Sequence, residues 1–284
     1  MKLAISNIAW QPAQARDIYA LMREYGFAGL EIAPGLAFPD EADPFAPSPA
    51  AASAFRNELD TFGLQPVSMQ SLLFGVVRAQ LFGTSAEQSQ FEQAMLRAIG
   101  LAECLGIPNL VFGSPKNRAY PTCMSSTEAH AHAAEVFQRL GEHAVRAGTR
   151  IAIEPNPASY GTNFLTTVAE TAEFVAALNH PGITLNYDLG ALYANAETGD
   201  AGVIYQAARG HVSHVHLSEP SLAPAPASPE ALASIARTLL QLGYRNWFSL
   251  EMRAPEGNLL HEIATRLALT AQVFSNLEDT CHAE

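Results

Sequence analysis

Four apolar runs in the second half of the sequence each end on a side chain that can bind a metal ion. These runs, IAIE, ITLNYD, HVSHVH and NWFSLE, end at Glu154, Asp188, His216 and Glu251. The end residues are separated by 34, 28 and 35 positions, and a parallel strand with its crossover helix and loops needs roughly 30 residues or more. The spacing therefore predicts four successive β/α units that carry these side chains at equivalent points of their strands.

The alternation of side chains along a strand predicts that all four residues point into a packed interior. Residues two apart share a face of a strand, so the residue just before each end faces the helices. Those residues are Ile153, Tyr187, Val215 and Leu250. A buried carboxylate without a partner would cost several kcal/mol or shift its pKa. Three converging acids and one histidine therefore predict a bound cation or an extensive hydrogen-bond network. The alternative is four unrelated polar strand ends, each bonded to loop amides.

Carboxylate oxygens with one imidazole nitrogen form a donor set that suits one divalent ion. Mn²⁺, Mg²⁺ and Co²⁺ match these ligands, and Zn²⁺ is also compatible. His214 precedes His216 by two residues, so we expect it one layer deeper in the interior. That position favours a histidine that supports the ligands from behind, or packs in the core, over a direct ligand.

The same alternation of strand and helix extends over the whole chain. Strands are predicted at residues 2–8, 28–33, 65–70, 109–113, 150–154, 183–188, 212–217 and 247–251. Helical patterns follow them at residues 13–25, 50–62, 86–105, 126–147, 167–178, 202–208, 229–242 and 258–274. Right-handed crossovers close eight such units into a (β/α)8 TIM barrel, whose active sites lie at the carboxyl ends of the strands.

This α/β barrel is predicted as a single domain over residues 1–284, with a short polar tail after the last helix. Segment 34–49 contains five prolines and is expected to be irregular. Segment 72–85 is expected to be an apolar loop that could fold over a pocket. A doubly wound open sheet is the alternative, but neither GxGxxG nor GxxxxGK[ST] follows the first strand.

The composition describes a globular chain and limits its partners. Hydrophobic residues make up 48% of the sequence and charged residues 15%, which is typical of a large core. The net charge of −12 repels nucleic acid on average, so no nucleic-acid partner is expected. Three cysteines without a CxxC pair suit a reducing compartment. With no secretory or long apolar stretch, we expect a cytoplasmic protein without a membrane span.

Polar residues at other strand ends could contact a substrate. The expected substrate-binding residues are Glu31, Gln70, Lys116, Asn117, Arg118 and Asn156. Lys116 and Arg118, in the loop SPKNR after the fourth strand, could hold a phosphate, a carboxylate or sugar hydroxyls. The alternatives are a solvated loop for these cations, barrel packing for Glu31 and Gln70, and turn formation for Asn156.

The segments IAIEPNP, LNYDLG, HVHLSE and SLEM resemble those of the xylose isomerase-like barrels, the sugar phosphate isomerase/epimerase superfamily. The similarity covers essentially the whole chain. This superfamily includes ketose 3-epimerases, hydroxypyruvate isomerase, inosose dehydratase and endonuclease IV. In the ketose epimerases the corresponding residues bind one divalent metal, commonly Mn²⁺, and the two glutamates are the acid/base pair. The resemblance implies that the metal ligands here are Glu154, Asp188, His216 and Glu251. It also implies that Glu154 and Glu251 are the catalytic residues.

The sequence departs from the ketose epimerase pattern at three positions. Where those enzymes have a substrate-contacting Glu, a His and an Arg, this chain has Tyr160, Ala191 and Leu222. These differences argue against a free-ketose 3-epimerase. The endonuclease branch uses a three-metal site with additional histidines, one of them at the position of Ala191. That difference and the acidic net charge argue against DNA repair.

The resemblance implies a metal-dependent isomerase or epimerase that acts on a small carbohydrate or a sugar-derived acid. The metal would bind adjacent carbonyl and hydroxyl oxygens and stabilise the developing enediolate, while one glutamate removes a proton and the other returns one. The first alternative is a dehydratase of a sugar acid or inosose, in which the enolate expels a β-hydroxyl. A metal-dependent phosphodiesterase or AP endonuclease and a non-catalytic sugar-binding barrel are the others. A homodimer is also compatible with the fold.

Overall fold

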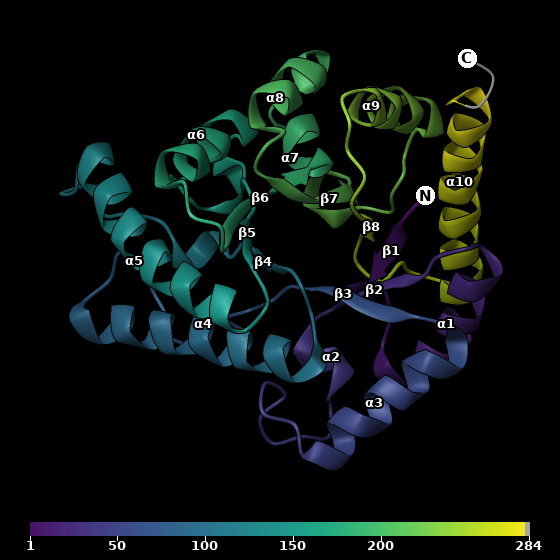
Figure 1. Cartoon of the computed structure of the whole chain (residues 1–284), viewed down its shortest axis with the longest axis horizontal. Coiled ribbons are helices and arrows are strands. Elements are labelled where there is room, and N and C mark those ends of the chain that lie inside the picture. Colours follow the sequence, from purple (N-terminus) through teal and green to yellow (C-terminus); the bar gives the residue numbers. More distant parts are fainter. Residues whose placement is uncertain (282–284) are drawn as a thin grey trace.

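Eight parallel strands form one closed barrel, and the helices lie around it (Figure 1). The computed structural model describes residues 1–281, with side chains up to residue 278. The strands are β1 (Leu3–Ser6), β2 (Gly29–Ile32), β3 (Gln65–Met69), β4 (Leu110–Phe112), β5 (Ile151–Ile153), β6 (Ile183–Asp188), β7 (Val212–Ser218) and β8 (Phe248–Glu251). Each strand pairs with the next in sequence order, and β8 pairs with β1. The predicted (β/α)8 TIM barrel is confirmed.

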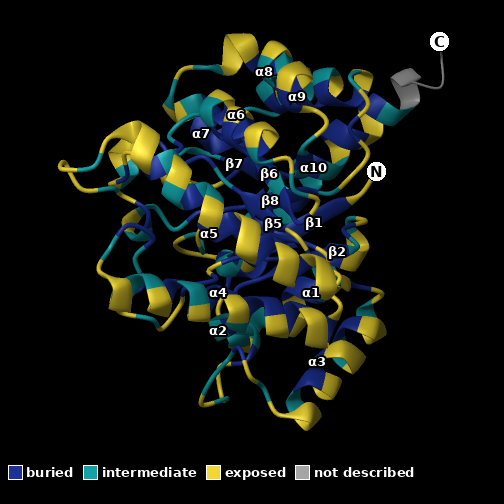
Figure 2. Ribbon diagram, turned by 60° about the vertical axis from the view of Figure 1, so that its left-hand side comes forward, coloured by how far each residue is buried: buried dark blue, intermediate teal, exposed yellow. Residues whose placement is uncertain are grey.

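The helices pack their apolar sides on the barrel and turn their polar sides to solvent (Figure 2). They are α1 (Ala15–Glu24), α2 (Pro34–Ala37), α3 (Pro49–Phe62), α4 (Ser85–Leu105), α5 (Ser126–Arg146), α6 (Val168–Leu178), α7 (Leu189–Ala194), α8 (Ala201–Ala208), α9 (Pro229–Gln241) and α10 (Leu259–Cys281). Local sequence signals define where helices α4 and α5 begin. Thr84 with Glu87, and Ser125 with Glu128, form capping boxes that satisfy the first backbone N–H groups.

Three segments differ from the sequence prediction. The segment expected to be irregular begins with the short helix α2. Its Pro34 lies in the first turn, where proline is compatible with a helix. The short helix α7 follows β6 directly, because the side chain of Asp188 caps it. Helix α10 continues to Cys281, where a polar tail was expected after residue 274, and buried Leu277 packs this extension on the core. The last three positions of that tail lie outside the described residues.

The strand register staggers the side chains at the mouth of the barrel. Asp188 on β6 lies opposite His216 on β7. Glu251 on β8 lies opposite Ser218, two residues beyond His216. The predicted ligands thus do not share one level of the hydrogen-bonded ladder. The tilt of the strands, which a closed barrel requires, still allows them to meet around one point.

The core consists of an apolar layer and a polar barrel interior. One cluster of buried apolar side chains joins the helices to the outward faces of the strands. Polar residues buried on or beside the strands include Ser6, Glu31, Ser68, Asn109, Asn186, His214, His216 and Ser249. Buried polar groups need partners, so the interior of the barrel is where a specific site is expected. Among the described helices, none combines the length and the apolar character that crossing a bilayer requires.

Candidate metal centre and active site

A cavity of about 470 Å³ opens where the strands end. Its walls come from the ends of β3 to β8 and from the loops that follow these strands, and they include Gln70, Lys116, Asp188 and Glu251. This is the end of the barrel at which TIM-barrel enzymes carry their active sites. The cavity is large enough for a monosaccharide-sized ligand.

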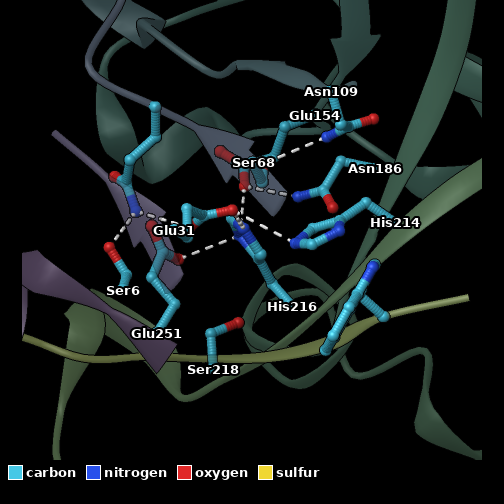
Figure 3. A network of polar contacts seen from close by, with 12 residues as sticks. Ser6, Glu31, Ser68, Asn109, Glu154, Asn186, His214, His216, Ser218 and Glu251 are labelled. Atoms are coloured by element: carbon cyan, nitrogen blue, oxygen red, sulfur yellow. Dashed lines mark hydrogen bonds and ion pairs between the residues drawn. The ribbon is translucent and has the colours of Figure 1, made fainter. Parts of the chain in front are cut away.

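The structure brings the four residues predicted as metal ligands together at this cavity. We refer to these residues as the ligand cluster: Glu154, Asp188, His216 and Glu251. Each offers one ligand atom, and the four atoms all lie within 4.8 Å of one another. Nδ1 of His216 lies 2.9 Å from Oε1 of Glu154 and 3.2 Å from Oε2 of Glu251. Oδ2 of Asp188 lies 3.7 Å from the same nitrogen. Figure 3 shows Glu154, His216 and Glu251 approaching one another.

The ligand cluster fits a divalent cation. Nδ1 of His216 is buried and forms no well-directed hydrogen bond with any side chain that the structure describes, although three carboxylates lie near it. A lone pair on this nitrogen and one oxygen from each acid would supply four ligand atoms. Such nitrogen and oxygen donors suit Mn²⁺, Mg²⁺, Co²⁺ or Zn²⁺.

The electrostatics of the metal-free cluster favour the same interpretation. Burial, together with the carboxylates of Glu154 and Glu251, raises the pKa of Asp188 to about 8. Burial also raises the pKa of Glu251, against the opposing effect of His216. Burial alone would lower the pKa of His216, but the carboxylates of Glu31 and Glu251 outweigh it and hold this pKa well above its usual value. Without a cation, the acids are difficult to ionise together.

Two amides and one glycine fix the carboxylate of Glu154. Nδ2 of Asn186 donates to Oε1 of Glu154 at 2.9 Å, and Nδ2 of Asn156 donates to Oε2 at 3.2 Å. Gly113, at the end of β4, is required for this arrangement because a Cβ there would collide with Oε2 of Glu154. The orientation of Glu154 therefore depends on side chains and backbone from three neighbouring strands.

The start of helix α7 fixes the carboxylate of Asp188. Oδ1 accepts a hydrogen bond from the backbone N–H of Ala191 at 2.6 Å, as in a helix N-cap. Oδ2 accepts from Oγ of Ser218 at 2.5 Å. The same hydroxyl oxygen accepts from the backbone N–H of Gly190 at 2.9 Å. Both oxygens of Asp188 are therefore held by the β6–α7 junction and by the end of β7.

A second buried cluster lies on the other side of the His216 ring (Figure 3). Oε2 of Glu31 is 3.1 Å from Nε2 of His216 and also 3.1 Å from Nε2 of His214. Nε2 of Gln70 donates to Oε1 of Glu31 at 2.9 Å and to Oγ of Ser6 at 2.8 Å. Glu31 and the two histidines offer ligand atoms close enough to hold an ion as well. In the described structure the Glu31–His216 contact is a hydrogen bond, whereas Nε2 of His214 forms none that is well directed. His214 lies behind His216, where the sequence predicted it.

Three of the six expected substrate-binding residues line the cavity, and these are Gln70, Lys116 and Asn156. Asn156 also orients Glu154. Lys116 is exposed in the loop after β4. The expectation for Glu31 needs correction, because this residue is completely buried behind His216 and does not line the cavity.

The expectation for Asn117 and Arg118 also needs correction. Nδ2 of Asn117 donates to the carbonyl oxygen of Ala79 at 2.7 Å, which fixes the loop after β3. Arg118 is fully buried, and its Nη2 donates to the carbonyl oxygen of Leu165 at 3.2 Å. Burial lowers the pKa of Arg118 to about 10. Both side chains therefore stabilise loops around the cavity, and neither lines it.

The structure adds wall residues that were not among the expected site residues. Ser218 and Glu219, at the end of β7, and Arg253, after β8, line the cavity. Four other wall residues have a left-handed backbone, with φ of 58°, 48°, 60° and 57°: Ser71, Ser114, Ser221 and Leu222. Such strain in non-glycine residues gathers at functional sites. Arg253 could have been predicted as a wall residue, because it follows Glu251 by two positions. Backbone strain cannot be read from the sequence.

A closed (β/α)8 barrel with three acids and a histidine at its mouth defines the class of protein. The family model of the xylose isomerase-like TIM barrel matches residues 19–270. The chain belongs to this family, and the resemblance found in the sequence is confirmed. The comparison with curated protein sequences gave no match.

The fold is similar to those of several sugar epimerases of known structure. L-ribulose 3-epimerase gives a TM-score of 0.80 at 16% identity, over 100% of this chain and 98% of that one. 3-Keto-D-glucoside 4-epimerase from E. coli gives 0.76 at 15%, over 97% and 99%. D-allulose 3-epimerase from Methylomonas sp., in complex with D-allulose, gives 0.74 at 20%, over 97% and 96%. At these identities the similarity shows the fold.

Proposed function

We propose that this protein is a divalent-metal-dependent isomerase or epimerase of a sugar or sugar acid. The observation that carries this proposal is the pair Glu154 and Glu251, which line one cavity and belong to the same ligand cluster. Two carboxylates that reach one substrate can act as proton acceptor and proton donor. The similar structures named above, all sugar epimerases, support this chemistry.

The two glutamates approach the cavity from different sides. Glu154 follows β5 and Glu251 ends β8, three strands further around the barrel. One of them removes the proton next to a substrate carbonyl, and the other returns a proton. Return to the same carbon gives an epimer, whereas return to the neighbouring carbon exchanges an aldose and a ketose. A divalent ion held by the ligand cluster, for which we propose Mn²⁺, supplies positive charge for the substrate oxygens that become negative.

Two cations in the cavity wall favour a substrate with an acidic group. Lys116 follows β4 and Arg253 follows β8, strands on opposite sides of the eight-stranded ring. Neither side chain forms an ion pair within the part of the chain whose side chains are described. A carboxylate or phosphate on the substrate would provide a partner for one of them. We therefore propose a sugar acid or sugar phosphate ahead of a neutral sugar.

Solvent isotope exchange tests the proposed function. Protein that is stripped of metal and reloaded with Mn²⁺ is incubated in D₂O with a panel of aldoses, ketoses, sugar acids and sugar phosphates. We expect one substrate group to gain deuterium next to its carbonyl and to yield an isomer or epimer, as seen by NMR. Glu251→Gln protein with a measured metal content serves as the control and is expected to give no exchange.

The products separate this proposal from its competitors. A product that has lost a hydroxyl as water would replace the isomerase by a dehydratase. Tight binding of a sugar by metal-loaded wild-type protein without any deuterium exchange would indicate a binding protein instead. Cleavage of a phosphodiester added to the same panel would indicate a hydrolase, and each of these results overturns the proposal.

A further inference from the structure

We propose that Glu31 is a positioning residue that orients His216 so that Nδ1, and not Nε2, of this histidine binds the metal. The inference rests on the proposed metal centre but concerns a residue on the opposite side of the His216 ring from the ligand cluster. Glu31 stands on β2 and His216 on β7, and 185 positions separate them in the chain. Their contact therefore spans the interior of the barrel.

The geometry allows only one proton arrangement on His216 when a metal is bound. Oε2 of Glu31 lies 3.1 Å from Nε2 of His216, and a carboxylate oxygen accepts hydrogen bonds. Nε2 therefore carries the proton, and the lone pair of the neutral ring is on Nδ1. Nδ1 is the atom that lies 2.9 to 3.7 Å from the three acids of the ligand cluster. A carboxylate that accepts the distal N–H of a ligand histidine fixes its tautomer and increases its basicity.

Glu31 is itself held rigidly in place. It is completely buried, and Nε2 of Gln70 donates to its other oxygen, Oε1, at 2.9 Å. Nε2 of His214 lies 3.1 Å from Oε2 on a further side. The rings of His214 and His216 stand edge to face, with centroids 5.4 Å apart. A carboxylate with this many partners can turn little, so the ring of His216 can turn little as well.

Glu31 lies outside the cavity wall, so its proposed role differs from substrate binding. Glu31 does not line the cavity, whereas its neighbour Gln70 does. The His216 ring lies between Glu31 and the acids of the ligand cluster, since its two nitrogens face the two groups. An effect of Glu31 on a reaction therefore passes through the residues it contacts, and metal affinity reports the route through His216 separately from the route through Gln70.

The variant Glu31→Gln tests the proposal by metal affinity. It keeps the size of the side chain but removes the charge that strengthens the Nε2–H bond of His216. We expect Mn²⁺ binding, measured by titration calorimetry on folded metal-free protein, to weaken about 10- to 100-fold. Unchanged affinity in a folded variant overturns the proposal.

Thr184→Val is the matched control. Oγ1 of Thr184 lies 2.7 Å from Oγ of Ser213 and donates to the carbonyl oxygen of Ile151 at 3.5 Å, so the change removes these two hydrogen bonds of β6 and keeps the side-chain shape. Thr184 contacts neither Glu31 nor the ligand cluster. We expect a lower melting temperature with Mn²⁺ affinity within twofold of wild type. An equal loss of affinity in both variants would reduce the role of Glu31 to general stability and overturn the proposal.

Wild-type protein provides a test that does not depend on the folding of a variant. With Zn²⁺ as a diamagnetic probe, ¹⁵N NMR of the histidine rings distinguishes a metal-bound Nδ1 from a metal-bound Nε2. We expect His216 to show a protonated Nε2 and a metal-bound Nδ1. The reverse pattern refutes the proposal while leaving the metal centre intact, whereas wild-type protein that binds no divalent ion refutes the proposed function as well.

Discussion

Glu154 and Glu251 are held differently, although both belong to the ligand cluster. Glu154 receives hydrogen bonds from two side-chain amides, those of Asn156 and Asn186. The polar side-chain contact of Glu251 in the described structure is Nδ1 of His216, at 3.2 Å. Glu154 is therefore fixed in direction before a substrate binds, whereas Glu251 retains more freedom to meet a substrate proton.

Replacement of either glutamate by glutamine tests their role as proton-transfer groups. Glu154→Gln and Glu251→Gln should each lower kcat by about 10²- to 10⁴-fold, because an amide cannot exchange the proton. The metal content of each variant is measured in parallel, since both residues are also proposed ligands. Glu103→Gln, at an exposed position of α4, is the control and should retain full activity. Full activity in a metal-loaded variant at position 154 or 251 would remove that residue from the mechanism.

The pKa of Asp188 gives the metal affinity a defined pH dependence. Burial and the neighbouring acids raise this pKa to about 8 in the metal-free protein, so metal binding below pH 8 must displace a proton. Apparent affinity should rise with pH through this range, because Asp188 must lose its proton and His216, whose pKa is also raised, must free Nδ1. Calorimetry in buffers of different ionisation enthalpy, at about pH 7, measures the released proton. Binding without proton release would contradict this assignment.

The same pKa predicts how the stability of the metal-free protein changes with pH. The pKa of Asp188 is raised above the value of roughly 3.9 expected in the unfolded chain, so the folded state binds more protons between about pH 4 and 8. The contribution of Asp188 to the free energy of unfolding therefore decreases as pH rises through this window. Urea unfolding at several pH values, on wild type and on Asp188→Asn, isolates the contribution.

Gly113 limits the size of the residue that can lie beside Glu154. In Gly113→Ala the new methyl group would collide with Oε2 of Glu154 and push the carboxylate out of the ligand cluster. We expect Mn²⁺ affinity to fall at least tenfold. Gly100→Ala is the control, because a Cβ at this helical position meets no atom within 4 Å. It should stabilise the fold by about 1 kcal/mol and leave metal binding unchanged.

Among the elements, the junction of β6 and α7 connects a helix start to the ligand cluster. Ser218→Ala removes the hydroxyl that donates to Asp188 and accepts from the N–H of Gly190. The unpaired N–H should cost about 1–3 kcal/mol of stability, and the freed carboxylate should weaken Mn²⁺ binding. Ser228→Ala removes the N-cap of α9 and should cost about 1 kcal/mol without any change in affinity. Equal metal affinities in the two variants would exclude a role of Ser218 in orienting Asp188.

The long elements could be predicted because their burial is periodic. Phe91, Met95, Ile99 and Ala102 recur at helical spacing, and all four are buried on one side of α4. Helix α7 could not be predicted in this way, because six residues make fewer than two turns and give no periodic pattern. Its start signal was Asp188, a residue that the sequence analysis had used as a metal ligand.

The candidate site was predictable only where it depends on strand ends. The four residues of the ligand cluster lie at or near the ends of four successive strands, so spacing and alternation indicated them. The contact between Glu31 and His216 depends on which way two side chains turn across the barrel, and a separation of 185 positions leaves no local signal for it. Arg118 illustrates the opposite error, since a charged loop residue proved to be fully buried.

At the scale of the whole molecule, binding of the proposed ion couples metal to fold stability. A ligand that binds only the folded state, at 100 times its Kd, adds about 2.7 kcal/mol of stability. For a chain of this size we expect Mn²⁺ to raise Tm by roughly 4–5 °C, and a chelator should reverse the shift. Circular dichroism should show a folded barrel in both states, because the apolar core does not involve the metal. An unchanged Tm at saturating Mn²⁺ would argue against binding at the ligand cluster.

Because β8 pairs with β1, the barrel closes only when its last strand has been synthesised. Every residue of the ligand cluster comes from the second half of the ring, and Glu251 comes from the strand that completes it. A nascent chain can pack its first four units on the ribosome without any means of holding the ion. The complete set of four ligands proposed for the ion therefore forms only after the final strand has docked.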